Sequence, residues 1–196
     1  MRQGSKELDP PIAIGAVQPS HVLLYFLDLL GYLRGRTIPR ETLNEALRDG
    51  VGFDGSSIPG FVGIEDSDMV MAPNPDSYTP LPEYFYGRST ALYICDIYRP
   101  GGSRFEGDPR YICQRCVDSL REKGLEPTVA PEVEFYLVKR GENGELRPVE
   151  DHVAEHHRYF DIDPGRDLTE QYRMDLVDAL TYMGIQVERH HHEVGP

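Results

Sequence analysis

Residues 91–98 read ALYICDIY, and residues 108–124 follow them as DPRYICQRCVDSLREKG. The first stretch is largely apolar and predicts a strand. In the second, Asp108 is a good N-cap, Pro109 suits the first helical position and Gly124 ends the helix. A strand followed by a well-capped helix indicates an α+β or mixed α/β fold.

The pattern continues toward the C-terminus with further strands and one more helix. A strong hairpin turn, Asn143-Gly144, separates two of the expected strands. A later run has apolar residues spaced for one helix face and stops at Gly184. The expected elements are strands over residues 128–139, 146–149 and 185–194 and a helix over residues 168–183.

Toward the N-terminus, residues 21–27 are apolar on both faces, as in a buried strand. A turn and a second strand follow, and Pro39 opens a short helix that Gly50 ends. Residues 51–90 hold many prolines and turn formers, so we expect them to be irregular. The expected division is a loose N-terminus over residues 1–20 and domains over residues 21–105 and 106–196.

The composition excludes several classes of function. The 196 residues carry 20 Lys and Arg against 33 Asp and Glu, a formal charge of −13. This balance argues against nucleic acid and anionic membranes as partners, because both attract cationic side chains. The longest apolar run is far too short to span a bilayer, and the N-terminus lacks the apolar region of a signal peptide. Three cysteines cannot all pair within the chain, which fits a reducing cytoplasm.

Two glutamates, Glu132 and Glu134, lie two residues apart in the strand expected over residues 128–139. On a strand they point to the same face, where their carboxylates repel each other. Their neighbours are apolar, so part of this strand is expected to be buried, and buried carboxylates need a cation. Hard oxygen ligands favour Mg²⁺ or Mn²⁺. An exposed strand face without metal is the alternative, and the pattern alone leaves both open.

A second candidate group is the run ERHHHE at residues 188–193. A mixed histidine and carboxylate cluster is a common metal or acid–base grouping, and a solvated strand end is the alternative. Glu188 and Glu193 are five residues apart, so on a regular strand they point to opposite faces. Both can face one site only if the strand twists, bulges or ends between them.

A third candidate is FDGSSIPGF at residues 53–61. Asp, Gly and Ser are the usual turn formers, so a plain turn is the simplest interpretation. An apolar residue at each end would hold the loop in place. The carboxylate and hydroxyls at its tip would then be available to a small polar or cationic ligand.

Cys113 and Cys116 form a C-x-x-C motif within the helix that Asp108 begins. Both belong to the apolar stripe of that helix. The sequence has no second C-x-x-C for zinc, and no thioredoxin-like strand leads into the motif. We therefore expect both thiols to pack in the core.

Taken together, the motifs occur in an order that resembles type I glutamine synthetase. They are FDGSSIPGF, SDM at 67–69, ICDIY with FEGDPRY, APEVEF and MGIQVERHHHEVGP. The resemblance runs from about residue 21 to residue 196 and covers only the N-terminal part of that family. It implies an α+β fold, with a β-grasp-like N-terminal domain followed by the first part of a mixed α/β catalytic domain. It also implies a ring-shaped homo-oligomer, a dodecamer, with active sites between neighbouring subunits.

The resemblance also implies roles for single residues in metal and nucleotide binding. Glu132 and Glu134 match the E-x-E motif that holds two or more divalent ions, Mg²⁺ or Mn²⁺. Glu193 matches the metal-binding glutamate of the HHE motif. Glu188 matches a nucleotide-binding glutamate.

Three further matches concern the ammonium substrate. Asp54 and Ser57 match the DGSS loop, which reaches into the adjacent subunit's site, where the aspartate helps to bind and deprotonate ammonium. Tyr159 in RYFD resembles the aromatic residue that lines the ammonium pocket.

The implied activity is ATP-dependent ligation of ammonia to L-glutamate in the cytoplasm, through γ-glutamyl phosphate. Divalent ions neutralise the phosphates, and Asp54 is the candidate base. A glutamate–amine ligase and a non-catalytic assembly or regulatory homologue remain alternatives. The family's later motifs do not occur within the 196 residues, so we expect a truncated chain that forms no glutamine alone.

Overall fold

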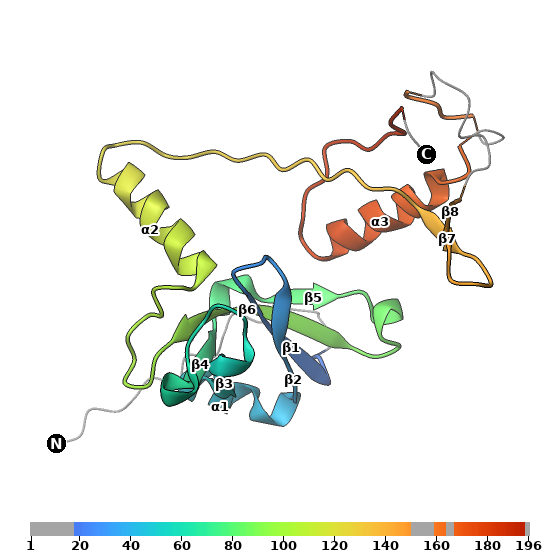
Figure 1. The fold of residues 1–196 in the computed structure, drawn as a ribbon. Coiled ribbons are helices and arrows are strands. Elements are labelled where there is room, and N and C mark those ends of the chain that lie inside the picture. The colour runs from blue at the N-terminus through green and yellow to red at the C-terminus, as the bar shows by residue number, and fades with distance from the viewer. Residues whose placement is uncertain (1–17, 150–158, 164–166, 195–196) are drawn as a thin grey trace. The chain divides into compact units, whose positions relative to one another are not determined.

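The computed structural model describes residues 18–149, 159–163 and 167–194. It divides into two compact units, Met1–Pro127 and Thr128–Pro196 (Figure 1). Most of the loose N-terminus expected over residues 1–20 lies outside the described residues. The domain boundary expected between residues 105 and 106 remains a prediction.

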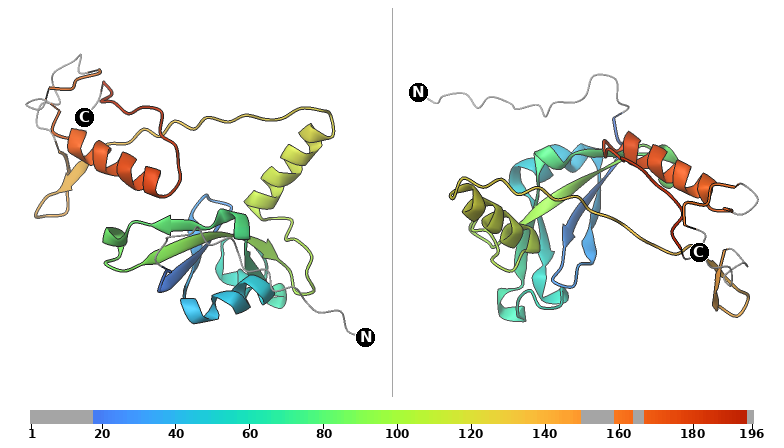
Figure 2. Two further views of the ribbon diagram at one scale, coloured as in Figure 1. Left: turned by 180° about the vertical axis from the view of Figure 1, so that it is seen from behind. Right: turned by 90° about the horizontal axis from the view of Figure 1, so that it is seen from above.

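The first unit is built on a six-stranded sheet with the order β2-β1-β6-β4-β3, in which β5 also pairs with β6. Figure 2 shows this sheet from two further sides. β1 and β6 run parallel, and the other pairs are antiparallel. The strands are β1 His21–Leu27, β2 Leu33–Pro39, β3 Val51–Asp54, β4 Asp68–Pro73, β5 Thr79–Leu81 and β6 Thr90–Tyr98.

Helices complete this unit. The α-helices are α1 Leu43–Asp49 and α2 Pro109–Arg121, and the 3-10 turns are η1 Arg40–Thr42, η2 Gly55–Ser57, η3 Ile64–Asp66, η4 Pro75–Ser77 and η5 Glu83–Phe85. Ala46 of α1 is buried against one face of the sheet. The other buried core residues are Val22, Leu24, Phe26, Phe61, Met69, Met71, Tyr93, Cys95, Ile97 and Phe105. Along β4 and β6, buried residues alternate with more accessible ones, as expected from the two-residue period of side chains on a strand.

The second unit contains one hairpin and one helix. The hairpin is formed by β7 Val138–Arg140 and β8 Leu146–Pro148, and the helix is α3 Glu170–Tyr182. Gly144 has φ +85° in the turn, as the Asn-Gly signal predicts. Among the described residues, no helix is both long and apolar enough to cross a lipid bilayer.

The α+β fold class is confirmed, together with the elements that carry strong local signals. These are β1, β6, α1, α2, α3 and the β7–β8 hairpin. The expectation that residues 51–90 are irregular is wrong, because β3, β4 and β5 lie there. β4 is held by pairing with β3 and β6 and by burial of Met69 and Met71, neither of which shows in the turn-rich local sequence.

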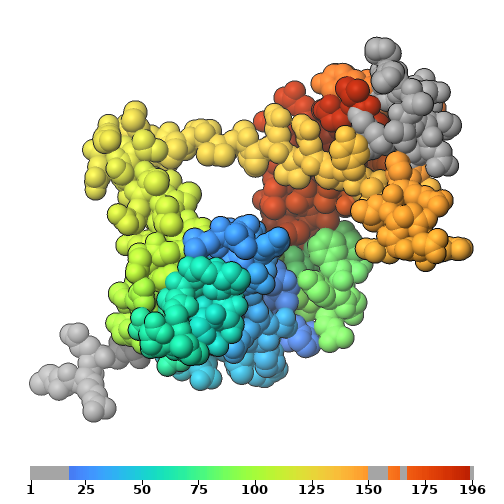
Figure 3. Space-filling view, in the orientation of Figure 1, coloured from blue at the N-terminus to red at the C-terminus, as the bar shows by residue number. Residues whose placement is uncertain are grey.

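Of the strand expected over residues 128–139, only residues 138–139 fall in a strand, β7. The strand expected over residues 185–194 does not form among the described residues. A strand needs a hydrogen-bonded neighbour. In the described part of the chain, no backbone hydrogen bond joins residues 128–136 to another segment. The stretch is a thin, exposed chain, yellow to orange in Figure 3, with Val133 81% exposed.

Candidate functional site

The Asp54 side chain organises the DGSS loop. Asp54 is the last residue of β3, and its carboxylate accepts hydrogen bonds from the Ser56 amide (2.9 Å), the Ser56 hydroxyl (2.6 Å) and the Ser57 hydroxyl (2.9 Å). Asp54 thereby caps the η2 turn. The hydroxyls of Ser56 and Ser57 hold the pKa of Asp54 below its ordinary value, so the exposed carboxylate is an anion at neutral pH.

Aromatic residues hold this loop at both ends, as its sequence predicts. The rings of Phe53 and Phe61 lie 5.0 Å and 5.9 Å from Phe26 in the core. Between them, the Gly55 amide donates to the Ser67 carbonyl at 2.7 Å. A Cβ at Gly55 would lie 2.5 Å from Met69 Cγ, so only glycine fits there without displacing the core. The loop therefore presents a rigid carboxylate at the surface.

The second unit brings Tyr159 close to the histidine run. The Tyr159 ring lies 5.4 Å from the His191 ring, and the Phe160 amide donates to the His192 carbonyl at 3.0 Å. His191 Nε2 lies 3.5 Å from Glu193 Oε1. The sequence places Tyr159 and Glu193 more than thirty residues apart, and the fold puts them in one neighbourhood.

Phe160 occupies the left-handed region of backbone conformation, with φ +60°. For a bulky residue this conformation is strained and persists only where surrounding contacts enforce it. Here the Phe160 ring stacks on Tyr159 at 4.0 Å and meets the His191 ring at 4.7 Å. The strain thus lies at the aromatic and histidine group of the second unit.

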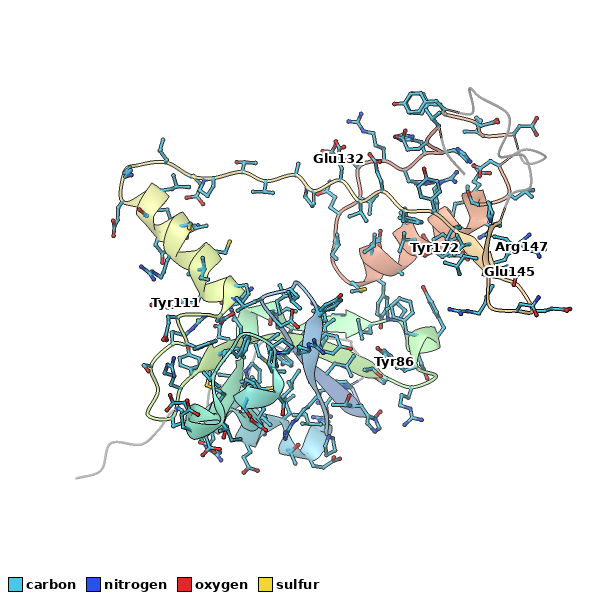
Figure 4. The ribbon with its side chains drawn as sticks, viewed as in Figure 1. Tyr86, Tyr111, Glu132, Glu145, Arg147 and Tyr172 are labelled. Atoms are coloured by element: carbon cyan, nitrogen blue, oxygen red, sulfur yellow. The ribbon has the colours of Figure 1, made fainter. Side chains whose placement is uncertain are left out.

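The remaining candidate carboxylates are not brought together. Glu132 lies on the extended segment (Figure 4), and both it and Glu134 are exposed. Glu188 forms an exposed ion pair with Arg189 at 3.4 Å. Within residues 18–149, 159–163 and 167–194, no group of three or more His, Cys, Asp or Glu side chains is arranged to hold a metal ion.

Within the second unit, the extended segment (residues 128–136) contacts helix α3. The Phe135 ring meets the Tyr172 ring of α3 edge-on at 6.0 Å. Figure 4 labels Tyr172. Glu132 and Glu134 precede this contact on backbone without strand pairing. Among the described residues, no strand pairing therefore holds the two carboxylates toward a common site.

The expectation that Cys113 and Cys116 pack in the core is wrong for the described residues, because both thiols are exposed on α2. Their helix has an apolar stripe, but none of its residues is buried. Cys95 is the buried thiol, and burial raises its pKa to about 12.

An ion pair between Asp167 and Arg173 at the start of α3 has no clear signal in the sequence. The Asp167 carboxylate accepts from the Thr169 amide at 3.0 Å, from the Thr169 hydroxyl at 2.8 Å and from the Arg173 guanidinium. Burial acts to raise the pKa of Asp167, but the hydrogen bonds from Arg173 and Thr169 outweigh it and hold the pKa at about 2. Polar residues near a helix start are common, so spacing alone does not reveal burial.

We expect Asp167→Asn to destabilise the chain by about 2 kcal/mol at pH 7, because the buried Arg173 loses its charged partner. The folded-state pKa lies below the ordinary value of 3.8. The stabilisation is therefore complete above about pH 4 and is lost as the pH falls toward about 2. Urea unfolding of wild type and variant across this range measures it, with exposed Asp178→Asn as the control. A constant difference between wild type and variant from pH 7 to pH 2 would contradict the assignment.

Comparison with known proteins gives consistent matches along the chain. The family profile "Glutamine synthetase, beta-Grasp domain" matches residues 19–100, and "Glutamine synthetase, catalytic domain" matches residues 106–196. Glutamine synthetase of Thermotoga maritima is 42% identical over 175 residues, which cover 89% of this chain and 39% of the relative. That of Thermococcus kodakarensis is 37% identical over 190 residues, or 97% of this chain and 40% of the relative. The chain thus spans about 40% of the length of these relatives.

Solved structures share the fold. A structure described as "Apo GmaS without ligand" superposes with a TM-score of 0.71 at 17% identity, covering 90% of this chain and 40% of that one. "CryoEM Plasmodium falciparum glutamine synthetase" gives 0.67 at 22% identity, covering 90% and 39%. At these identities the likeness concerns the fold alone.

Proposed function

The chain belongs to the glutamine synthetase family, and from this premise we propose that the whole protein ligates ammonia to L-glutamate with ATP, through γ-glutamyl phosphate. The observation that carries the proposal is the 37–42% identity to curated glutamine synthetases over most of the chain. The two family profiles support it too, because a β-grasp domain followed by a catalytic domain is the order that the resemblance implies.

In this proposal, Asp54 binds ammonium and accepts its proton, and Ser57 holds the Asp54 carboxylate in place. Ammonium is the main form at neutral pH and is not nucleophilic, so a base is required. The rigid, ionised carboxylate of Asp54 supports the binding of the cation. Tyr159 lines the ammonium pocket, a role supported by its contact with His191.

The proposed metal ligands are Glu132, Glu134 and Glu193, and Glu188 contacts the nucleotide. Carboxylate oxygens are the donors that Mg²⁺ and Mn²⁺ prefer, so the chemistry of this donor set fits two or more such ions. When bound, divalent ions neutralise the phosphate charge of ATP. The exposure of all four side chains leaves their oxygens available for ligation.

We also propose that the protein acts as a homo-oligomeric ring, a dodecamer, in the cytoplasm. In the ring, the DGSS loop of each subunit would complete the active site of a neighbouring subunit. The domain boundary between residues 105 and 106 is part of the same proposal. It is supported by the family profiles, which end at residue 100 and resume at residue 106.

The test is to express the longest protein that the gene encodes, together with the 196-residue chain, and to measure glutamine and ADP formed from glutamate, ATP and ammonium. We expect the long protein to form both products in equal amounts and the chain alone to form none. Products that require methylamine in place of ammonium would show a glutamate–amine ligase. No product with either acceptor would overturn the proposed activity.

Mn²⁺ titration of the 196-residue chain separates a partial site from a non-catalytic homologue. Because three proposed ligands are present, we expect weak binding that Glu132→Gln weakens further. Exposed Glu142→Gln is the matched control. No binding to the wild-type chain would favour the non-catalytic homologue.

A further inference from the structure

The turn between β1 and β2 exposes large apolar side chains. Residues 27–33 read LDLLGYL, and we call them the hairpin tip. Surface turns are normally built from Gly, Pro, Asn, Asp and Ser. Here five large apolar side chains are between 38% and 66% exposed, namely Leu27, Leu29, Leu30, Tyr32 and Leu33. Leu27 and Leu33 are direct cross-strand partners, so the side chains form one continuous patch.

A buried aspartate fixes the backbone of the hairpin tip. Asp28 is 1% exposed. Its carboxylate accepts hydrogen bonds from the Leu30 amide (2.9 Å), the Tyr32 amide (2.9 Å) and the Arg34 guanidinium (2.8 Å). The Asp28 amide also donates to the Tyr32 carbonyl at 3.0 Å. Because the backbone is already ordered, a partner that covers the tip pays little conformational entropy.

The hairpin tip lies directly beside the DGSS loop. A Cβ at Gly60, in the segment FDGSSIPGF, would lie 3.0 Å from Leu29 Cδ1, so the Leu29 side chain packs on the Gly60 backbone. The Phe26 ring of β1 also lies 5.0 Å from the Phe53 ring and 5.9 Å from the Phe61 ring, at the two ends of that segment. In the proposed ring, the DGSS loop reaches the neighbouring subunit. A subunit that meets this loop would therefore also meet the tip.

The charge of the chain favours the hairpin tip as the place where two copies touch. The 196 residues carry a formal charge of −13, so two copies repel each other as they approach. The one charged residue of the tip is Asp28, which is buried and paired with Arg34 at 2.8 Å. The tip is thus a neutral, apolar face on an acidic chain. The cores of protein–protein interfaces are likewise apolar and depleted of charged residues.

We propose that the hairpin tip is a docking surface for a second copy of this chain, at the subunit contact beside the DGSS loop. The inference rests on the homo-oligomer of the proposed function and names a surface that holds it together. Side chains at the centre of an interface carry most of the binding energy, whereas those outside it carry little. Leu30 is the most exposed of the five apolar side chains, at 66%, and is therefore the residue to test.

The test measures the mass of the long gene product by sedimentation at a series of protein concentrations. Leu30→Asp puts an unpaired charge into the contact, so the concentration at which half of the oligomer dissociates should rise about tenfold or more. Leu30→Met keeps an apolar side chain of similar size and should stay within about twofold of wild type. Tyr84→Asp is the matched control, because Tyr84 is 68% exposed on η5, and it should also stay within about twofold.

Two further measurements separate docking from folding and from catalysis. The Tm of the 196-residue chain should change by no more than about 2 °C in Leu30→Asp, because exposed side chains contribute little to the fold. Glutamine formation per subunit of the long Leu30→Asp protein should recover as its concentration rises, since mass action restores the contact. A Tm lowered well beyond this range would assign Leu30 a structural role and overturn the inference.

The remaining outcomes distinguish the inference from the proposed function. An oligomer that dissociates at the same concentration in wild type and Leu30→Asp would overturn the inference and leave the proposed ring intact. An equal loss in Tyr84→Asp would also overturn it, because any added surface charge would then weaken the oligomer. A monomeric wild type would overturn the proposed ring and the inference together. A wild type that assembles but forms no glutamine would overturn the proposed activity alone, and sedimentation of the variants would still decide the inference.

Discussion

Replacing Asp54 by alanine is expected to lower the glutamine-forming kcat/KM of the long gene product by about 100-fold or more, which is the range that general bases contribute. The variant removes both the cation-binding charge and the proton acceptor. It should hardly disturb the fold, because the Asp54 carboxylate is exposed and, among the described residues, accepts its hydrogen bonds from Ser56 and Ser57 of its own loop. Initial rates at saturating glutamate and ATP, with ammonium varied, measure the loss.

Two further variants separate the charge from the loop. Asp54→Asn keeps the shape and an acceptor oxygen but loses the charge, so it should be nearly as impaired as Asp54→Ala. Ser56→Ala removes one donor to the carboxylate and leaves the charge, so its loss should be about tenfold or less. If Asp54→Asn kept most of the wild-type activity, the base would have to be another group. If Ser56→Ala were as impaired as Asp54→Ala, the loop conformation and not the carboxylate would carry the activity.

The elements that could be predicted are those whose signals are local. Asp108 and Pro109, two adjacent residues, mark the start of α2, and the structure shows the Asp108 carboxylate accepting from the Arg110 amide at 3.0 Å. The same holds for Gly144 in the β7–β8 turn. Caps and tight turns are stabilised by backbone groups only a few residues away, so a short stretch of sequence is enough to predict them.

The elements that could not be predicted depend on distant partners. β4 forms because β3 and β6 flank it, so its own composition understates its strand character. Residues 128–136 show the reverse: their composition favours a strand, but no backbone hydrogen bond joins them to another segment among the described residues. The candidate site follows the same division. The DGSS turn was predictable, whereas the β3–β4 register, which pairs Asp54 with Asp68, is encoded by no local pattern.

The N-cap of α2 also anchors the helix to the sheet, in a way that the sequence does not reveal. Asp108 is 1% exposed. Its second carboxylate oxygen accepts from the Ile97 amide of β6 at 3.1 Å and from the Arg104 guanidinium at 2.9 Å. Arg104 and Arg110 in turn share Asp96 at 3.1 Å and 2.9 Å. One side chain thus joins a strand, a turn and a helix.

Asp108→Ala is therefore expected to destabilise the chain by about 4 kcal/mol, because it leaves a strand amide unsatisfied, removes the cap and leaves Arg104 with one carboxylate fewer. Asp108→Asn keeps an oxygen for the Arg110 amide but loses the charge, so its cost should be about half as large. Asp118→Ala, at an exposed position of the same helix, should cost less than about 0.5 kcal/mol. Urea unfolding followed by circular dichroism ranks the three. If Asp108→Ala and Asp118→Ala lowered the free energy of unfolding equally, the contacts of Asp108 with Ile97 and Arg104 would contribute nothing to stability. Other contacts would then have to anchor α2.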